Sequence, residues 1–243
     1  MQNASLRSGL SKNLGLWNEQ PGQPSVICVK RGDSHVAFMS MFLDANDTPI
    51  ADQVPVMVLD GATLFPGTLL PLFIFEQRYR SMLECALETD RLIAIAQPTE
   101  DSSGELRNIG GGGLIRACVR NKDGTSHLVL HGVERARFLS WPQVKPFRIA
   151  EVEVLRSTPI EQSAGQSLIE ELMSIVRRIK ISGVALPEQF EDQLTAIESM
   201  DAVVDIACAS LVSDPSKRQA LLEEADGIKR LRLLLSLLRP QAR

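Results

Sequence analysis

Residues 54–80 read VPVMVLDGATLFPGTLLPLFIFEQRYR, and this stretch decides the fold. Its first six residues, 54–59, are almost entirely apolar and predict a strand. Pro55 is compatible with this strand because it stands near the beginning, where a missing backbone donor is tolerated. A second apolar run predicts a strand over residues 69–74. Pro71 inside that run removes a donor from the ladder, so we expect an edge strand, a bulge or a barrel corner there.

The chain beyond these two strands predicts one helix and several further strands. Apolar residues at helical spacing predict a helix over residues 76–88. A loop rich in Pro, Ser and Gly is expected over residues 97–113, and it includes the cluster Gly110–Gly113. Asp123-Gly124 supplies the positive φ that a hairpin turn needs. The remaining runs predict strands over residues 92–96, 114–120, 126–133, 135–139 and 149–155.

After Pro159 the apolar period changes from two residues to about 3.6, which indicates helices. The stripe over residues 168–179 predicts the first of them. A strand-rich half followed by a helical half predicts an α+β chain, with a β-rich subdomain over residues 53–158 and a helical bundle over residues 159–243. Signals that begin further helices stand at Pro187, Ser199 and Asp214-Pro215, and Asp226-Gly227 is expected to break the last of these before a fifth helix that begins near Ile228.

Residues 1–52 differ from the rest of the chain. Gly, Ser, Asn, Gln and Pro interrupt residues 1–25, and the apolar runs that follow are brief. We therefore expect an extra N-terminal segment that is poorly ordered or loosely attached. It has no apolar region of signal-peptide length, and no later stretch is long enough to span a membrane, so no membrane partner is expected.

The composition is that of a globular protein, since 44% of the 243 residues are hydrophobic and 23% are charged. The net charge of −4, with no basic excess on one element, argues against a nucleic-acid partner. The cysteines lie far apart, without the spacing of a zinc site or a disulfide framework, and favour a reducing, cytoplasmic compartment. They are Cys28, Cys85, Cys118 and Cys208.

Recognisable catalytic motifs do not occur in the sequence. There is no GxxxxGK[ST] loop and no GxSxG elbow. Gly110–Gly113 leads into a predicted strand, whereas a phosphate-binding loop leads into a helix. His127 and His131 share a face of a predicted strand but would lie about 13 Å apart, too far to bind one metal ion. The sequence therefore predicts a chain that is not an enzyme and has no cofactor and no metal site.

The stretch quoted first resembles the N-terminal, substrate-binding domain of Lon proteases. Leu64-Phe65-Pro66-Gly67, followed by LPLFIFEQRYR over residues 70–80, is similar to the opening of that domain. The Phe-Glu-x-Arg-Tyr variant is closest to short bacterial proteins that carry the domain alone. Residues 113–117 (GLIRA) and 128–137 (LVLHGVERAR) resemble later strands of the family. The resemblance covers about residues 54–238.

This resemblance implies a strongly bent sheet, a pseudo-barrel of the PUA type, that holds one helix and precedes a helical bundle. It also implies a non-catalytic module that captures unfolded or exposed polypeptide segments, because the chain shows neither the ATPase module nor the Ser-Lys protease module of Lon. Unfolded or flexible polypeptides are the expected partners. An adaptor or scaffold that binds one folded partner, such as a protease or an ATPase, is the first alternative, and an uncharacterised hydrolase or small-ligand protein is the second.

A polypeptide would need an apolar groove or an open strand edge. The loop over residues 61–70 is expected to carry two apolar side chains near its tip, and the cleft between the subdomains is a further candidate. Three aromatic side chains beyond the loop could line such a groove or could equally belong to the core. The candidate polypeptide-binding residues are Leu64, Phe65, Phe73, Phe75 and Tyr79.

Overall fold

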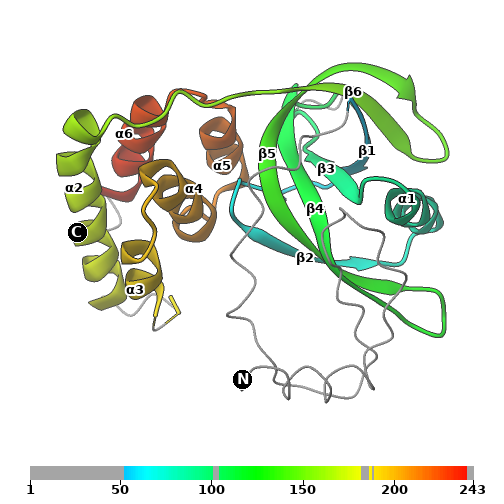
Figure 1. The fold of residues 1–243 in the computed structure, drawn as a ribbon, viewed down its shortest axis with the longest axis horizontal. Coiled ribbons are helices and arrows are strands. Elements are labelled where there is room, and N and C mark those ends of the chain that lie inside the picture. The colour runs from blue at the N-terminus through cyan, green and yellow to red at the C-terminus, as the bar shows by residue number, and fades with distance from the viewer. Residues whose placement is uncertain (1–51, 101–103, 182–185, 188, 240–243) are drawn as a thin grey trace, which may run out of the picture.

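The computed structural model describes residues 52–100, 104–181, 186–187 and 189–239. Poor order was expected of the N-terminal segment, residues 1–52. Residues 1–51 of this segment lie outside the described residues. A strand-rich part with one helix is followed by a helical part, which confirms the predicted α+β class (Figure 1).

The strands of the described chain form one sheet with the order β2-β5-β4-β3-β1-β6. An additional pairing of β5 with β6 closes the sheet into a bent, barrel-like structure and leaves β2 at the end of the order, which confirms the bent sheet implied by the resemblance. β1 pairs with β3 in parallel, and the other pairs are antiparallel. The strands are β1 (Gln53–Val58), β2 (Leu69–Ile74), β3 (Leu92–Ala96), β4 (Ile109–Arg120), β5 (Ser126–Gln143) and β6 (Arg148–Val154).

The 18-residue strand β5 takes part in both sides of the barrel. Its first part pairs with β2, its second part pairs with β6, and β4 runs along both. Register shifts between Gly112 and Gly113, and again after Ile115, mark irregularities that let the β4–β5 pair bend without separating. The prediction of two strands, over residues 126–133 and 135–139, is therefore wrong, because one bent strand covers both ranges.

Gly110–Gly113 lies inside β4, so the prediction of a flexible loop there is wrong. The physical reason is the close packing of the loop between β1 and β2 against the sheet. A Cβ on Gly111 would overlap the carbonyl oxygen of Leu64, and a Cβ on Gly132 would overlap that of Phe65. Glycine is therefore needed at both positions, as expected where one backbone approaches another closely.

The predicted helix between the second and third strands is confirmed as α1 (Gln77–Glu88). Its buried stripe, which includes Tyr79, Met82 and Ala86, joins the barrel side chains in one apolar core. At the far end of the β4–β5 pair, Gly124 has a φ of 82°, which confirms the predicted positive-φ turn.

Five helices follow in the described part of the chain, and their starts match several sequence signals. The side chains of Ser199, Asp214 and Asp226 each accept a hydrogen bond from a backbone N–H in the first turn of the helix that follows. These caps fix where three helices begin. The helices are α2 (Gln162–Ile181), α3 (Phe190–Thr195), α4 (Met200–Leu211), α5 (Pro215–Glu223) and α6 (Gly227–Leu238).

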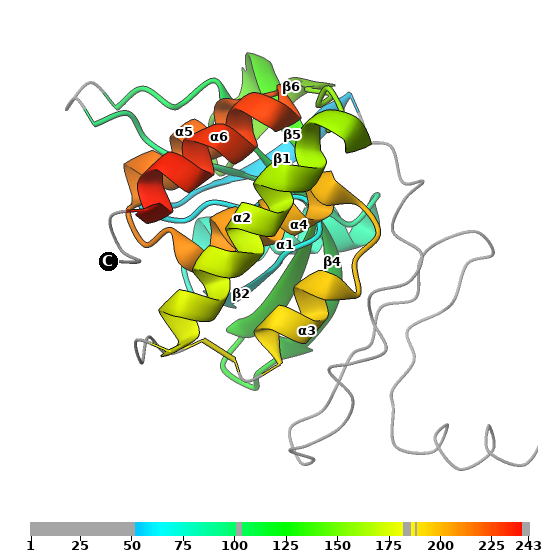
Figure 2. The ribbon, with the colours of Figure 1, turned by 90° about the vertical axis from the view of Figure 1, so that its left-hand side faces the viewer.

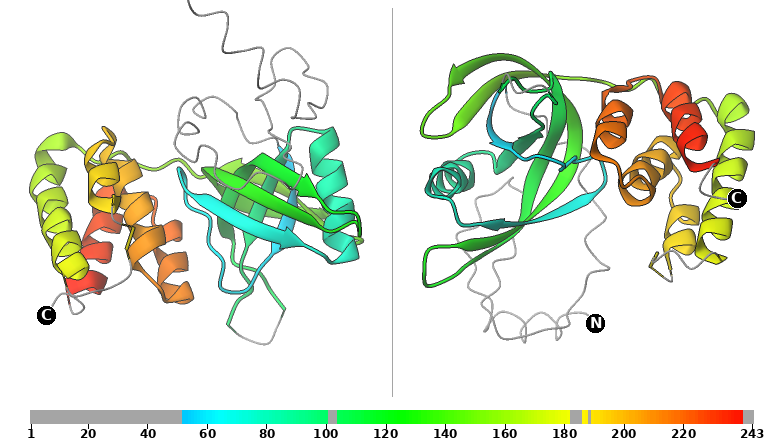
Figure 3. Two further views of the ribbon diagram at one scale, coloured as in Figure 1. Left: turned by 90° about the horizontal axis from the view of Figure 1, so that it is seen from below. Right: turned by 180° about the vertical axis from the view of Figure 1, so that it is seen from behind.

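The helical bundle packs on one side of the barrel, and α1 lies on the opposite side (Figure 3). In Figure 2, which looks onto the bundle, α2 and α6 lie side by side and make the largest helix–helix contact. The helices bury a continuous apolar core of their own, and α5 is the helix that contacts β4. No helix in the described residues is both long and apolar enough to cross a membrane.

The glycine contacts give a stability prediction. Gly111→Ala should lower the free energy of unfolding by about 1–3 kcal/mol, because its new methyl group meets backbone atoms of Leu64 that cannot rotate away. Urea denaturation followed by circular dichroism measures this. Leu139→Ala, at an exposed position on β5, is the control and should change the free energy by less than about 0.5 kcal/mol. Equal stability of Gly111→Ala and the parent chain would contradict the packing argument.

Candidate functional site

Leu64 and Phe65 were expected near an exposed loop tip, and the structure corrects this. Their side chains are 1% and 0% exposed, respectively. Leu64 belongs to the barrel core, whereas Phe65 belongs to the core of the helical bundle. These two side chains are therefore unavailable to a partner at the surface of the folded chain.

The physical reason is that the loop between β1 and β2 is pinned to the sheet. Gly67 N–H donates to the carbonyl of Gly132 at 2.8 Å, and Gly132 N–H donates to the carbonyl of Thr68 at 2.8 Å. The Thr68 hydroxyl donates to the carbonyl of Phe65 at 2.7 Å. Because glycines in β4 and β5 allow this approach, the loop points its two large apolar side chains inward.

Tyr79 is also part of the core, in line with the core interpretation rather than the groove interpretation. Its ring is buried, and its hydroxyl donates to the carbonyl of Val58 at 3.0 Å. This hydrogen bond joins the first turn of α1 to the end of β1. Tyr79 therefore holds α1 in place and offers little surface of its own.

Phe73 and Phe75 are exposed, so the alternative that placed them in the core is wrong. Phe73 is 50% exposed and Phe75 is 58% exposed. Their ring centroids lie 6.0 Å apart, and the Phe73 ring lies 4.9 Å from that of His127 on β5. We call these three residues the aromatic patch. His127, considered above only as a metal ligand, joins it because β2 and β5 pair Phe73 with His127.

The aromatic patch lies at a strand edge. β2 ends the strand order and pairs only with β5 among the described strands. Leu70, Leu72 and Ile74 turn toward the barrel core, so the alternate residues Pro71 and Phe73 face outward. An edge strand with exposed aromatic rings offers both backbone groups and apolar surface to an extended peptide.

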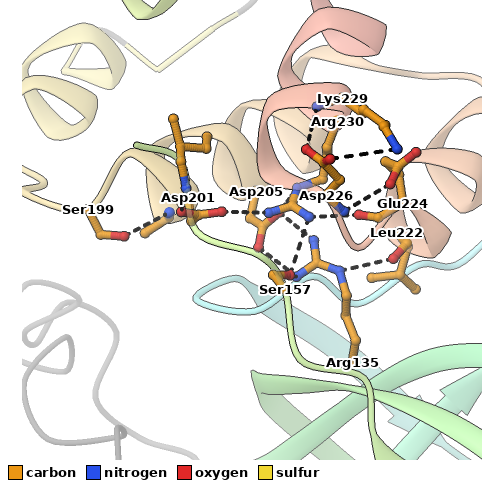
Figure 4. Close-up of polar contacts among 12 residues, drawn as sticks. Arg135, Ser157, Ser199, Asp201, Asp205, Leu222, Glu224, Asp226, Lys229 and Arg230 are labelled. Carbon is orange, nitrogen blue, oxygen red and sulfur yellow. Dashed lines mark hydrogen bonds and ion pairs between the residues drawn. The ribbon is translucent and has the colours of Figure 1, made fainter. Parts of the chain in front are cut away.

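The junction between the barrel and the bundle holds a buried charge network (Figure 4). Arg135 on β5 donates two hydrogen bonds to the carboxylate of Asp205 on α4, at 2.6 and 3.0 Å. Arg230 Nε on α6 lies 3.0 Å from the same carboxylate, and Arg230 Nη2 donates to Asp201 at 2.9 Å. Arg135 therefore pairs with a carboxylate inside the fold.

Other guanidinium N–H groups of this network donate to neutral acceptors. Arg135 Nε donates to the carbonyl of Leu222 at 2.9 Å, and Arg230 Nη1 donates to the carbonyl of Glu224 at 2.7 Å. Both arginines donate to the Ser157 hydroxyl at 3.3 Å. Buried polar atoms fill this part of the junction, which is therefore a bonded interface and not an apolar cleft.

Displaced pKa values in the network have structural causes. Burial lowers the pKa of Arg230, and the nearby Arg135 lowers it further, while Asp205 and Asp201 raise it. Burial also raises the pKa of the Cys208 thiol, and Asp205 adds to that effect. A thiol that stays protonated has no nucleophilic character. Among the described residues, no group of three or more His, Cys, Asp or Glu could hold a metal ion.

Comparison with known proteins now adds to this geometry. A family model described as the ATP-dependent protease La (LON) substrate-binding domain matches residues 53–239. Lon protease 2 of Herpetosiphon aurantiacus is 24% identical over 203 residues, a match that covers 78% of this chain and 25% of that protein. Lon protease of Escherichia coli strain K12 is 23% identical over 191 residues, covering 76% of this chain and 24% of that protein. The chain thus spans about a quarter of the length of these relatives.

Two solved structures share the fold. The N-terminal domain of Mycobacterium avium complex Lon protease superposes with a TM-score of 0.62 at 21% identity, covering 77% of this chain and 98% of that one. The Lon N-terminal domain protein from Xanthomonas campestris gives a TM-score of 0.56 at 19% identity, covering 76% and 97%. At these identities the likeness shows the fold alone.

The charge network gives a second stability prediction. Asp205→Asn should destabilise the chain by about 3–5 kcal/mol, because it leaves two buried guanidinium groups without their shared carboxylate. Glu171→Gln is the matched control, since it breaks an exposed pair with Arg239 and should cost at most about 1 kcal/mol. Urea denaturation measures both. Similar losses for the two variants would show that the buried pair has no special weight.

A third prediction concerns pH. Burial, with a smaller effect of Arg116, lowers the pKa of His131 below its usual 6.5. As the pH falls, His131 therefore binds a proton in the unfolded chain before it does so in the folded chain. The contribution of neutral His131 to stability is complete above about pH 6.5 and is lost as the pH falls toward the pKa of the folded state.

Denaturation midpoints between pH 7 and pH 5 test this, because the interval lies within the range of about pH 5–8 in which histidine changes its charge. The parent chain should lose stability over that interval more steeply than His131→Gln. Burial raises the pKa of Glu134, which acts in the opposite direction, but both proteins share that residue and its effect cancels in the comparison. Parallel curves would contradict the assignment to His131.

Proposed function

We propose that this chain, which belongs to the family of Lon substrate-binding domains, binds flexible polypeptide segments without catalysing a reaction on them. The observation that carries this proposal is the aromatic patch on the edge strand β2. Phe73 and Phe75 leave half or more of their surface in water although the chain has ample core to bury them. Exposed aromatic clusters are typical of binding surfaces.

The edge position favours an extended peptide as the occupant. A peptide that lies along β2 can exchange main-chain hydrogen bonds with it while its alternate side chains contact the aromatic rings. Main-chain bonding is independent of sequence, which suits a module that accepts many unfolded chains.

The chemistry of the junction argues against the hydrolase alternative. A hydrolase needs a nucleophile beside a base in an open cleft. Cys208 and Arg230, whose pKa values are displaced, lie in the packed interior between barrel and bundle. The adaptor alternative has one supporting observation, since the relatives, of which the match to this chain covers about a quarter, are named as proteases. A folded protease is the partner that this alternative would favour.

Binding of fluorescent unfolded casein, without added nucleotide, tests the proposal. The double variant Phe73→Ser/Phe75→Ser should weaken binding at least about tenfold, or ~1.4 kcal/mol, because it removes the rings that shelter the peptide. Leu139→Ser/Ile181→Ser is the matched control, since both residues are exposed apolar side chains outside the patch. Circular dichroism confirms that each variant is folded.

Two outcomes would overturn the proposal. The first is a parent chain that binds no unfolded polypeptide, which would favour a folded partner and a search for it by pull-down. The second is an equal loss in the control variant, which would mean non-specific apolar adhesion.

A casein-derived peptide with alternate N-methylated amides should also bind more weakly than its parent, because strand addition needs those donors.

A further inference from the structure

A groove of about 690 Å³ opens between the end of β1, the first turn of α1 and the turn that joins β5 to β6. This volume lies within the range of about 300–1,000 Å³ that is usual for ligand sites. No residue of the aromatic patch or of the buried charge network lines this groove. Its lining residues are Val56, Val58, Arg78, Tyr79, Val144, Lys145, Pro146, Phe147 and Arg148.

The interior of this groove is apolar and fixed. Val56 and Phe147 are buried, and Phe147 packs into the barrel core. The Tyr79 hydroxyl is already bonded to the carbonyl of Val58, so the ring cannot turn away. Val58, Val144 and Pro146 are the other apolar lining residues, and the groove therefore offers a preformed surface for a small apolar side chain.

The rim of the groove is positively charged. It carries Arg78, Lys145 and Arg148, and no lining residue is acidic. Arg148 lies over the ring of Trp141 at 5.4 Å, and neither Arg148 nor Lys145 has an ion pair with a carboxylate in the part of the chain that the structure describes. In a chain of net charge −4, three cations around one apolar groove form a local exception.

Arg78 is partly engaged. Its guanidinium contacts the exposed carboxylate of Glu76 at 2.8 Å and lies 4.6 Å from the centre of the Tyr79 ring. An exposed pair of this kind is weak and exchanges readily. Stacking on Tyr79 holds the charged plane at the mouth of the groove, where it can meet a second carboxylate.

We propose that this groove binds a carboxylate carried on a short apolar peptide segment. The inference rests on the proposed function and adds to it a second site, for segments that place an anion next to small apolar side chains. Arginine and lysine N–H groups form strong, charge-assisted hydrogen bonds with carboxylates, and the apolar walls take the adjoining side chain. The carboxylate comes either from the C-terminus of a chain or from an internal Asp or Glu.

Three fluorescent peptides based on the sequence Ala-Val-Leu-Val-Ala distinguish these sources. The first has a free C-terminus, the second is amidated, and the third is amidated with glutamate in place of the central leucine. Fluorescence anisotropy should show at least about tenfold tighter binding for a peptide with a carboxylate than for the neutral amide. Preference for the first peptide assigns a chain terminus, and preference for the third assigns an internal side chain. Equal affinity for all three overturns the proposal.

Variants place the site. Lys145→Gln/Arg148→Gln should abolish the preference for a carboxylate, whereas Lys122→Gln/Lys217→Gln makes the same change of charge elsewhere and should keep it. Val144→Glu provides an independent check, because this side chain is 55% exposed at the groove and a carboxylate there would repel the ligand. A preference that survives both groove variants overturns the assignment.

Two further results distinguish carboxylate binding in the groove from nucleic-acid binding there and from casein binding at the aromatic patch. A single-stranded oligonucleotide that displaces the peptides at equal concentration would show a nucleic-acid site and overturn the proposal. Casein binding by Lys145→Gln/Arg148→Gln should remain close to that of the parent chain, since the aromatic patch is untouched. If the parent binds casein but shows no preference for a carboxylate, only this inference fails. If it binds no casein, the proposed function fails.

Discussion

The close approach of the loop between β1 and β2 to the glycines of β4 and β5 is the constraint on which the rest of the structure depends. It lets two adjacent side chains, Leu64 and Phe65, enter two different cores. The same loop is held from the other side by α5, because Arg218 Nη2 donates to the carbonyl of Gly61 at 2.7 Å. The barrel and the bundle are consequently joined by apolar packing that neither could supply alone.

The buried charge network fixes the orientation of the bundle relative to the barrel, which apolar packing alone does not determine. A guanidinium group donates along set directions, so the two bonds from Arg135 to Asp205 define both a distance and an angle between β5 and α4. Gln219 adds a third tie, since its side-chain amide donates to the carbonyl of Ile109 on β4 at 2.7 Å. The aromatic patch and the groove both lie on the barrel, whose paired strands hold the backbone beneath them.

Much of the fold could be predicted from the sequence because its signals are local. Helix starts at Ser199 and Asp214 depend on neighbouring residues, and the turn at Gly124 depends on one backbone angle.

The candidate site was harder to predict from the sequence than the fold. Leu64 and Phe65 sit among Gly and Pro as surface turns do, and only the distant Gly111 and Gly132 turn them inward. The sequence left Phe73 and Phe75 between a groove and the core for a related reason, because the run LLPLFIF over residues 69–75 is entirely apolar and lacks the alternation that separates an inward face from an outward face. The exposure of Phe73 depends on which face of β2 meets the barrel, and that is decided by its pairing with β5. The cationic groove brings together residues from β1, α1 and the turn before β6, a juxtaposition that no local pattern contains.

The place of β1 in the sheet has a consequence for how the chain folds as it leaves the ribosome. β1 lies between β3 and β6, so one of its two partners is made about 90 residues after it, as the bounds of β1 and β6 require. Until β6 emerges, one edge of β1 lacks its strand partner. Nascent chains with such edges are prone to misassociation, and slow synthesis before residue 148 would prolong that period. The helices α2–α6 follow β6 in the chain, so they pack against the barrel after its last strand has been made.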